Sequence, residues 1–186
     1  MVLITQSGPE TLPIGSPAPA FRDLPGTDGK RYGLDSFKGA KVVVLSFTCN
    51  HCPYAKAYED RFIELAREFA PRGVAFAAIN PNDGVTYPDD SFGNMKVRAR
   101  EKSFPFPCLR DERQDVARAY GAVCTPHLFV LDGARNLAYE GRIDDNWKSP
   151  ADAKSHDLRD AIEDLLAGNP VRVPRTNPMG CSIKWK

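Results

Sequence analysis

The sequence has almost no net charge and no long apolar run, and we expect no secretory leader. Its 25 Lys and Arg residues and 24 Asp and Glu residues give a formal net charge of +1, which provides no electrostatic attraction toward nucleic acid or a membrane surface. No apolar run approaches the roughly 18 residues needed to span a bilayer. The first residues, MVLITQSGPETLPIGSPAP, lack a cationic stretch followed by a long apolar one. We therefore expect a cytoplasmic protein that binds neither nucleic acid nor membrane.

Cysteine is also scarce. Only five are present, at Cys49, Cys52, Cys108, Cys124 and Cys181, and only one pair is closely spaced. A secreted fold held together by disulfides would need denser, evenly paired cysteines. In a reducing compartment, the close pair is expected to be catalytic or metal-binding rather than structural.

The pattern of apolar residues predicts one α/β domain. The chain has 186 residues, 42% of them hydrophobic, which is enough for a single well-cored domain. We expect an N-terminal arm over residues 1–13, the domain over 14–168 and a solvated tail over 169–186. The expected strands cover 41–47, 74–79, 106–109, 127–132 and 136–142, and the expected helices cover 53–69, 92–102, 114–120 and 155–167. A polar loop rich in Pro, Gly and Asp covers 79–95. This order predicts a sheet covered by helices.

The motif Cys49-Asn50-His51-Cys52 stands where a strand gives way to a helix. Positions i and i+3 on a helical turn lie about 5–6 Å apart between Cβ atoms. A disulfide needs about 3.8 Å, which a tightened first turn can reach. The two thiols can therefore cycle between dithiol and disulfide with little backbone movement. Proline is tolerated in a first helical turn, so Pro53 fits this placement.

Attack on a disulfide requires a thiolate, so one of the two cysteines must have a lowered pKa. We expect Cys49 to lie at the exposed end of the strand, at the helix N-terminus, where backbone dipoles favour negative charge. His51 would supply positive charge and titrate together with it. These effects predict a pKa of about 6–7 for Cys49, which would act as the nucleophile. Cys52, one turn deeper, would resolve the mixed disulfide. The role requires that a partner can reach these sulfurs.

Three segments of the chain resemble the redoxin (AhpC/TSA-like) branch of the thioredoxin-like superfamily. They are IGSPAPAFRDLPGTDGKRYGLDSFKGAKVVVLSF, FTCNHCPY and YGAVCTPHLFVLD. The resemblance covers roughly residues 14–167. It implies a thioredoxin-like fold, with a central mixed β-sheet flanked by helices, an N-terminal extension, an insert after the second core strand and a C-terminal tail.

The resemblance also implies a cis bond between Thr125 and Pro126 that lies against the two cysteines. A proline at the start of a strand leaves the backbone open on one side. The backbone of Thr125 would then pair with an extended substrate strand by β-addition.

Several other residues are candidates for roles at the site. Cys124 is either a redox thiol or a packing thiol, and Cys181 is either an additional resolving thiol or an unpaired one, whereas Cys108 is expected in the core. Residues that follow a strand end in an α/β sheet often border the ligand site, so the loop residues Asn82, Asp83 and Tyr87 are candidates for shaping substrate access. The carboxylate that takes the proton from the resolving thiol is not identified; the candidates are Glu59, Asp83 and Asp111.

The leading hypothesis is a thiol-disulfide oxidoreductase without a cofactor or a metal. Its partners would be a disulfide-containing substrate and an electron-donor thiol/disulfide protein. One alternative is a peroxiredoxin-like peroxidase: Cys52-Pro53 matches the end of the P-x-x-x-T-x-x-C pattern, but Cys49 replaces the Thr and Leu45 replaces the first Pro. A second alternative is a copper-binding module, since Cu(I) can be held by two thiolates, whereas Zn²⁺ needs four ligands.

Overall fold

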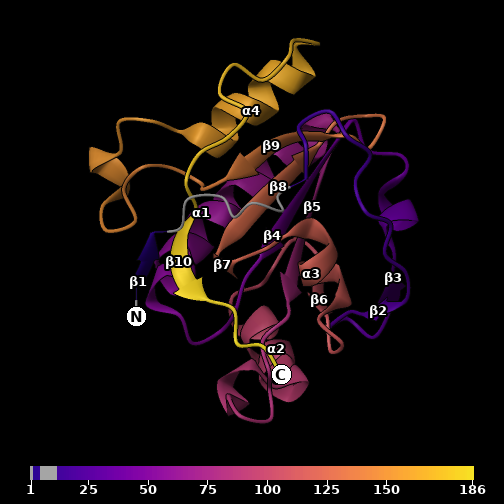
Figure 1. The fold of residues 1–186 in the computed structure, drawn as a ribbon, viewed down its shortest axis with the longest axis vertical. Helices are drawn as coiled ribbons and strands as arrows, with labels where there is room; N and C mark the ends of the chain where they lie inside the picture. The colour runs from indigo at the N-terminus through magenta and orange to yellow at the C-terminus, as the bar shows by residue number, and fades with distance from the viewer. Residues whose placement is uncertain (1, 5–11) are drawn as a thin grey trace.

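The computed structural model describes residues 2–4 and 12–186, and its centre is a mixed five-stranded sheet (Figure 1). The strands lie in the order β6 (Cys108–Arg110), β5 (Val74–Asn80), β4 (Val42–Phe47), β8 (His127–Leu131) and β9 (Leu137–Gly141). β4, β5 and β6 are parallel, and β8 and β9 are antiparallel to their neighbours. The predicted α/β fold with a mixed central sheet is confirmed.

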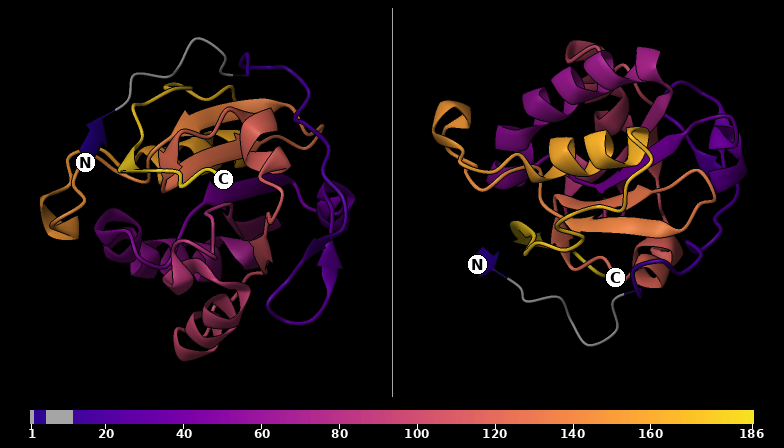
Figure 2. Two further views of the ribbon diagram at one scale, coloured as in Figure 1. Left: turned by 60° about the horizontal axis from the view of Figure 1, so that its bottom comes forward. Right: turned by 90° about the horizontal axis from the view of Figure 1, so that it is seen from above.

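Helices cover both faces of this sheet. α1 (Pro53–Phe69) and α4 (Asp157–Leu166) pack on one face, over side chains that include Val44 and Val130. α3 (Asp115–Tyr120) packs on the other face together with the segment that contains Phe21. Figure 2 shows α1 and α4 on one side of the strands and α3 on the other. Since both faces are covered, every residue of β4 is buried, as the continuous apolar run predicts.

The local patterns place most elements within two residues of their observed bounds. The insert after β5 forms the 3₁₀ turn η3 (Pro88–Asp90) and α2 (Phe92–Glu101). The remaining short elements are β2 (Leu24–Pro25), β3 (Arg31–Tyr32), η1 (Leu34–Phe37), η2 (Ala70–Arg72) and η4 (Pro150–Asp152). In the described part of the chain, no helix has both the length and the apolar character that crossing a membrane requires.

The C-terminal segment is not the solvated tail that the sequence predicts. Its residues form β10 (Met179–Ser182), which lies between β1 (Val2–Ile4) and β7 (Cys124–Thr125) in a second sheet (Figure 1). Both pairings are antiparallel. Four residues are too few for a periodic signal, and their partners are far away in sequence, so no local pattern reveals this strand. The rest of the predicted N-terminal arm (residues 1 and 5–11) lies outside the described residues.

Candidate active site

The two cysteines of the motif lie in the connection between β4 and α1. α1 begins at Pro53, with Cys52 as its N-cap in extended backbone conformation (φ −68°, ψ 127°). Cys49 lies three residues before the cap. The expected position of Cys49 at the helix N-terminus is therefore wrong by one turn. The unpaired amides of a first helical turn favour negative charge on the capping residue, so here they act on Cys52.

Thr125 contacts the sulfur atoms of both cysteines. Its hydroxyl lies 3.0 Å from Cys49 Sγ, and its carbonyl oxygen lies 3.2 Å from Cys52 Sγ. The bond from Thr125 to Pro126 is cis, which confirms the conformation that the resemblance implies. The chain thus brings the end of β7 against the motif, although the two segments are more than 70 residues apart.

Both cysteines are buried. The exposed fraction is 4% for Cys49 and 0% for Cys52, so the expectation that Cys49 occupies an exposed strand end is wrong. The surroundings are nevertheless partly polar, since Thr125 touches both sulfurs and the carboxylate of Asp90 lies close to Cys49. The cover over the pair includes Cys181 of β10.

Cys181 is the third sulfur of the site. Its Sγ lies 2.8 Å from Cys52 Sγ, and it packs against the cluster of Cys49, Cys52 and Ala55. Cys124 differs, because its Sγ donates to the carbonyl oxygen of Pro126 at 3.5 Å and it is not part of that cluster.

Cys108 is a core residue, as expected. It lies buried in β6, where burial raises the pKa of its thiol to about 12.

The negative charge of the reduced site lies on Cys52 rather than on Cys49. The hydrogen bond with Cys52, then burial, then the charge of Asp90 raise the pKa of Cys49 well above its ordinary value. The hydrogen bond from Cys49 is the largest cause that lowers the pKa of Cys52 to about 5; burial opposes this, and the Cys181 thiol and the Ala55 amide favour it. The Thr125 carbonyl works against the charge, since it can accept a hydrogen bond only from the protonated thiol. The predicted low pKa of Cys49 is therefore wrong, because the hydrogen bond with Cys52, burial and the charge of Asp90 all disfavour a thiolate at this sulfur.

This distribution of charge predicts the pH dependence of the reduced protein. A lowered thiol pKa means that the thiolate persists at neutral pH and is lost only as the pH falls through the folded value. We expect the ultraviolet absorbance of one thiolate to titrate with a midpoint near pH 5. Cys52→Ser should remove this step, and Cys108→Ser should leave it unchanged. A single midpoint at the ordinary thiol pKa of about 8.5 would contradict the assignment.

Asp90 is the carboxylate of the site, and sequence reasoning missed it. It is fully buried and comes from η3 in the insert. It accepts hydrogen bonds from the Asn50 backbone N–H (2.6 Å), Asn82 Nδ2 (2.9 Å) and Asn80 Nδ2 (3.2 Å), and its Oδ2 lies 2.5 Å from His51 Nδ1. Two adjacent aspartates in a polar loop carry no local signal of burial, so only the fold reveals which of them enters the site.

The three carboxylates considered from sequence have other partners. Glu59 forms a bidentate ion pair with Arg98, Asp83 accepts from Thr86 in the loop, and the Asp111 carboxylate accepts from the Ala117 backbone N–H.

Of the three loop residues expected to shape access, Tyr87 borders the motif and Asn82 lies next to it, whereas Asp83 contacts Thr86 and Lys184 instead. The ring of Tyr87 stacks on His51, with the centroids 5.5 Å apart, and the side chain of Asn82 binds Asp90. His51 therefore lies between Asp90 and Tyr87, with about a quarter of its side chain exposed.

One group among the described residues could offer ligands to a metal ion. The donor atoms of Cys49, His51 and Asp90 all lie within 4.8 Å of one another. A structural zinc site needs four ligands, and two of these three groups already bind each other. The copper alternative relies instead on two thiolates, those of Cys49 and Cys52, which lie in one cluster with Cys181.

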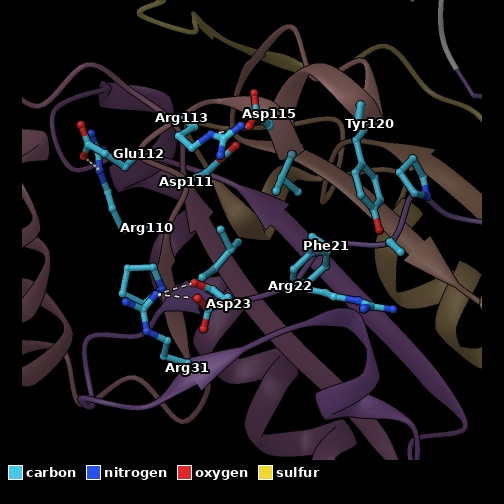
Figure 3. A pocket seen from close by; sticks show the side chains of 16 residues that line it. Phe21, Arg22, Asp23, Arg31, Arg110, Asp111, Glu112, Arg113, Asp115 and Tyr120 are labelled. Atoms are coloured by element: carbon cyan, nitrogen blue, oxygen red, sulfur yellow. Dashed lines mark hydrogen bonds and ion pairs between the residues drawn. The ribbon is translucent and has the colours of Figure 1, made fainter.

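A pocket of about 710 Å³ lies away from the cysteines, between the N-terminal segment and α3. Its charged side chains are largely paired with one another, as in Arg31 with Asp23 and Arg113 with Asp115 (Figure 3). Its sixteen lining residues contain no cysteine. It is therefore separate from the sulfur cluster.

A sequence profile described as the AhpC/TSA family matches residues 14–140, which is more than half of the chain. The chain belongs to the AhpC/TSA family. Among family relatives, the thiol:disulfide interchange protein DsbE of Pasteurella multocida is 28% identical over 142 residues, covering 75% of this chain and 71% of the relative. The thiol-disulfide oxidoreductase ResA of Bacillus thuringiensis is 27% identical, covering 66% of each chain. This AhpC/TSA family member is thus a distant homologue of thiol-disulfide oxidoreductases.

A solved structure extends the likeness to nearly the whole chain. An uncharacterized conserved protein from Geobacillus kaustophilus is 40% identical, with a TM-score of 0.89, and the match covers 95% of this chain and 94% of that one. The coverage runs beyond residue 140, where the family profile ends.

Proposed function

We propose that this AhpC/TSA family protein is a thiol-disulfide oxidoreductase whose Cys49 and Cys52 cycle between dithiol and disulfide. The observation that supports this most is the convergence of both sulfurs on Thr125, beside Pro126, with Cys52 charged at neutral pH. A thiolate attacks a disulfide far more readily than a thiol does, so the charge selects Cys52 as the attacking sulfur. This reverses the order proposed from sequence.

The reaction has two exchange steps. The Cys52 thiolate attacks one sulfur of the substrate disulfide, a bond forms between them, and the other substrate sulfur leaves as a thiolate. Cys49 then gives up its proton and attacks Cys52 Sγ, which closes the Cys49–Cys52 disulfide and releases the second substrate sulfur. The Asp90 carboxylate, within 4.8 Å of Cys49 Sγ, is placed to accept that proton. Tyr87 stacks on His51 and so borders the motif.

The partners follow from this chemistry. The substrate is a protein or small-molecule disulfide, and a thiol or dithiol protein returns the electrons. The reaction uses no cofactor, because the two sulfurs hold the electrons themselves.

Reduction of insulin disulfides by the purified protein tests the proposal. With a dithiol reductant present, the wild type should reduce insulin faster than the double variant Cys49→Ser, Cys52→Ser. Cys108→Ser is the matched control, since that thiol belongs to β6 and to a core cluster other than the one that holds Cys49 and Cys52, and it should reduce insulin at the wild-type rate. Equal rates for the wild type and the double variant would refute the function.

One observation favours thiol peroxidase activity as a second candidate. Cys52, which precedes Pro53, carries the lowered pKa, as a peroxide-attacking cysteine requires. Against it, the hydroxyl of Thr125 contacts Cys49 and not Cys52. Hydrogen peroxide consumption that is lost in Cys52→Ser but kept in Cys49→Ser would favour the peroxidase. No consumption by the wild type would exclude it.

A further inference from the structure

β10 occupies the position where an extended substrate strand would pair. It runs antiparallel to β7, with Cys181 opposite Thr125 and Ser182 opposite Cys124. The pairing continues one residue further, where the Ile183 N–H donates to the Val123 carbonyl oxygen at 3.4 Å. The backbone edge before Pro126, which β-addition would use, is thus filled by the protein's own chain.

The pairing brings a sulfur of β10 against the charged cysteine. Cys181 Sγ lies 2.8 Å from Cys52 Sγ, so β10 presents to Cys52 the atom that a substrate disulfide would present. Cys181 is only partly buried, whereas Cys49 and Cys52 are almost completely covered. Of these three sulfurs, Cys181 is the one that a partner in solution reaches most readily.

Hydrogen bonds to the insert and to the start of α3 hold the residues that follow β10. The Lys184 backbone N–H donates to Asn82 Oδ1 at 2.9 Å, and its carbonyl oxygen accepts from the Asp83 N–H at 2.8 Å and from Gln114 Nε2 at 2.9 Å. The Lys186 N–H donates to Gln114 Oε1 at 2.9 Å. The insert and the start of α3 therefore fix the chain end, and with it the position of Cys181.

We infer that β10 occupies the place of a substrate strand and that Cys181 is a third redox thiol. By internal disulfide exchange, Cys181 replaces Cys49 as the disulfide partner of Cys52. This inference rests on the proposed function, because it begins from the Cys49–Cys52 disulfide. Cys181 gives up its proton and attacks Cys52 Sγ. The Cys52–Cys181 bond forms, the Cys49–Cys52 bond breaks, and Cys49 leaves as a thiolate and takes up a proton. No electrons are gained or lost in this step.

The exchange moves the oxidised bond toward solvent. One thiolate of a dithiol protein then attacks Cys181 Sγ, forms a mixed disulfide with it and releases Cys52 as a thiolate. The second thiol of that protein gives up its proton and attacks the partner sulfur of the mixed disulfide, which releases Cys181 and leaves the partner as a disulfide. All three thiols of this chain are then restored. The strand thus connects a covered pair of sulfurs to an outside reductant.

Peptide mapping of the oxidised protein tests the inference. Tryptic cleavage places Cys49 and Cys52 in residues 42–56, Cys181 in 176–184 and Cys124 in 119–135. We expect oxidised wild type to contain peptide 42–56 both with an internal disulfide and joined to peptide 176–184. Oxidised Cys49→Ser should give the joined form alone, through Cys52. A non-reducing gel should show that the bond lies within one chain.

Two results would overturn the inference: no joined peptide in oxidised Cys49→Ser, or joining of 176–184 chiefly to the peptide with Cys124. The insulin assay on wild type is scored separately. If the wild type reduces insulin but no joined peptide forms, the inference fails and the proposed function stands. If the wild type does not reduce insulin, the proposed function fails whatever the mapping shows.

A glycine provides a second test that leaves every cysteine in place. A Cβ at Gly180 would lie 2.3 Å from the Thr125 carbonyl oxygen, whereas a Cβ at Gly39 would meet nothing within 4 Å. Gly180→Ala should therefore loosen β10 and speed alkylation of Cys52 by about 10-fold or more through local opening. Gly39→Ala should alkylate at the wild-type rate. Equal rates in all three proteins would show that β10 does not cover Cys52.

Discussion

Replacing Cys52 with serine should slow insulin reduction at least about 1,000-fold, the order of loss seen when a catalytic nucleophile is removed. The pKa of Cys52 is lowered to about 5, so it is a thiolate at neutral pH. A serine hydroxyl in the same position stays protonated and does not attack a disulfide sulfur. The measurement is the initial rate of insulin reduction at fixed reductant, with Cys108→Ser as the control.

A trapped mixed disulfide would show which of the two cysteines attacks the substrate first. If Cys52 attacks first, the double variant Cys49→Ser, Cys181→Ser should accumulate a mixed disulfide with the substrate, because both sulfurs that contact Cys52 are then absent. Cys52→Ser should accumulate none. Mass spectrometry of the intact protein distinguishes these cases. A mixed disulfide on Cys49 in the Cys52→Ser variant would restore the order expected from sequence alone.

The burial of the sulfurs connects the proposed disulfide exchange at Cys49 and Cys52 with the proposed role of β10. A buried thiolate next to two thiols is protected from solvent, but it reacts only when a partner reaches it. In this chain the covering element is a short strand with a sulfur of its own, paired to the edge that a substrate would use. We propose that displacement of β10 admits the substrate, and that its return allows Cys181 to receive the oxidised bond.

The sequence predicts the sheet and the position of the motif because those signals are local. The run from Val42 to Phe47 is apolar at nearly every position, and the helical period after Pro53 is clear, so β4 and α1 lie where expected. The motif is a local signal as well, because Cys49 and Cys52 are three residues apart, so the sequence alone identifies this pair of cysteines. Which of them carries the charge depends first on the hydrogen bond between the two thiols and then on the contact with Cys181, with the helix start at Pro53 adding to both.

The rest of the site is made by contacts between distant parts of the chain. Cys181 is 129 residues from Cys52, and β10 is recognisable only through its pairing with β7. Asp90 reaches His51 from a loop 39 residues away. A side chain in such a loop has no periodicity that marks it as buried, so Glu59, Asp83 and Asp111 were equally plausible before the fold was known.

Asp90→Asn should lower the free energy of unfolding by about 3 kcal/mol, the scale of a lost hydrogen bond between charged groups in the interior. The carboxylate accepts from the Asn50 backbone, Asn80 and Asn82, and it contacts His51. An amide of the same shape has one acceptor oxygen, and its NH₂ group would face donors that are already in place. Urea unfolding at neutral pH, with an unchanged m-value, measures the difference.

The adjacent aspartate supplies the control for that measurement. Asp89 is exposed, and its backbone carbonyl, not its carboxylate, accepts from Asn50 Nδ2. Asp89→Asn should therefore change the stability by no more than about 0.5 kcal/mol. Equal losses for the two variants would mean that Asp90 does not hold the motif. A loss confined to Asp90→Asn would mean that this carboxylate of the insert stabilises the connection that carries Cys49, 41 residues earlier in the chain.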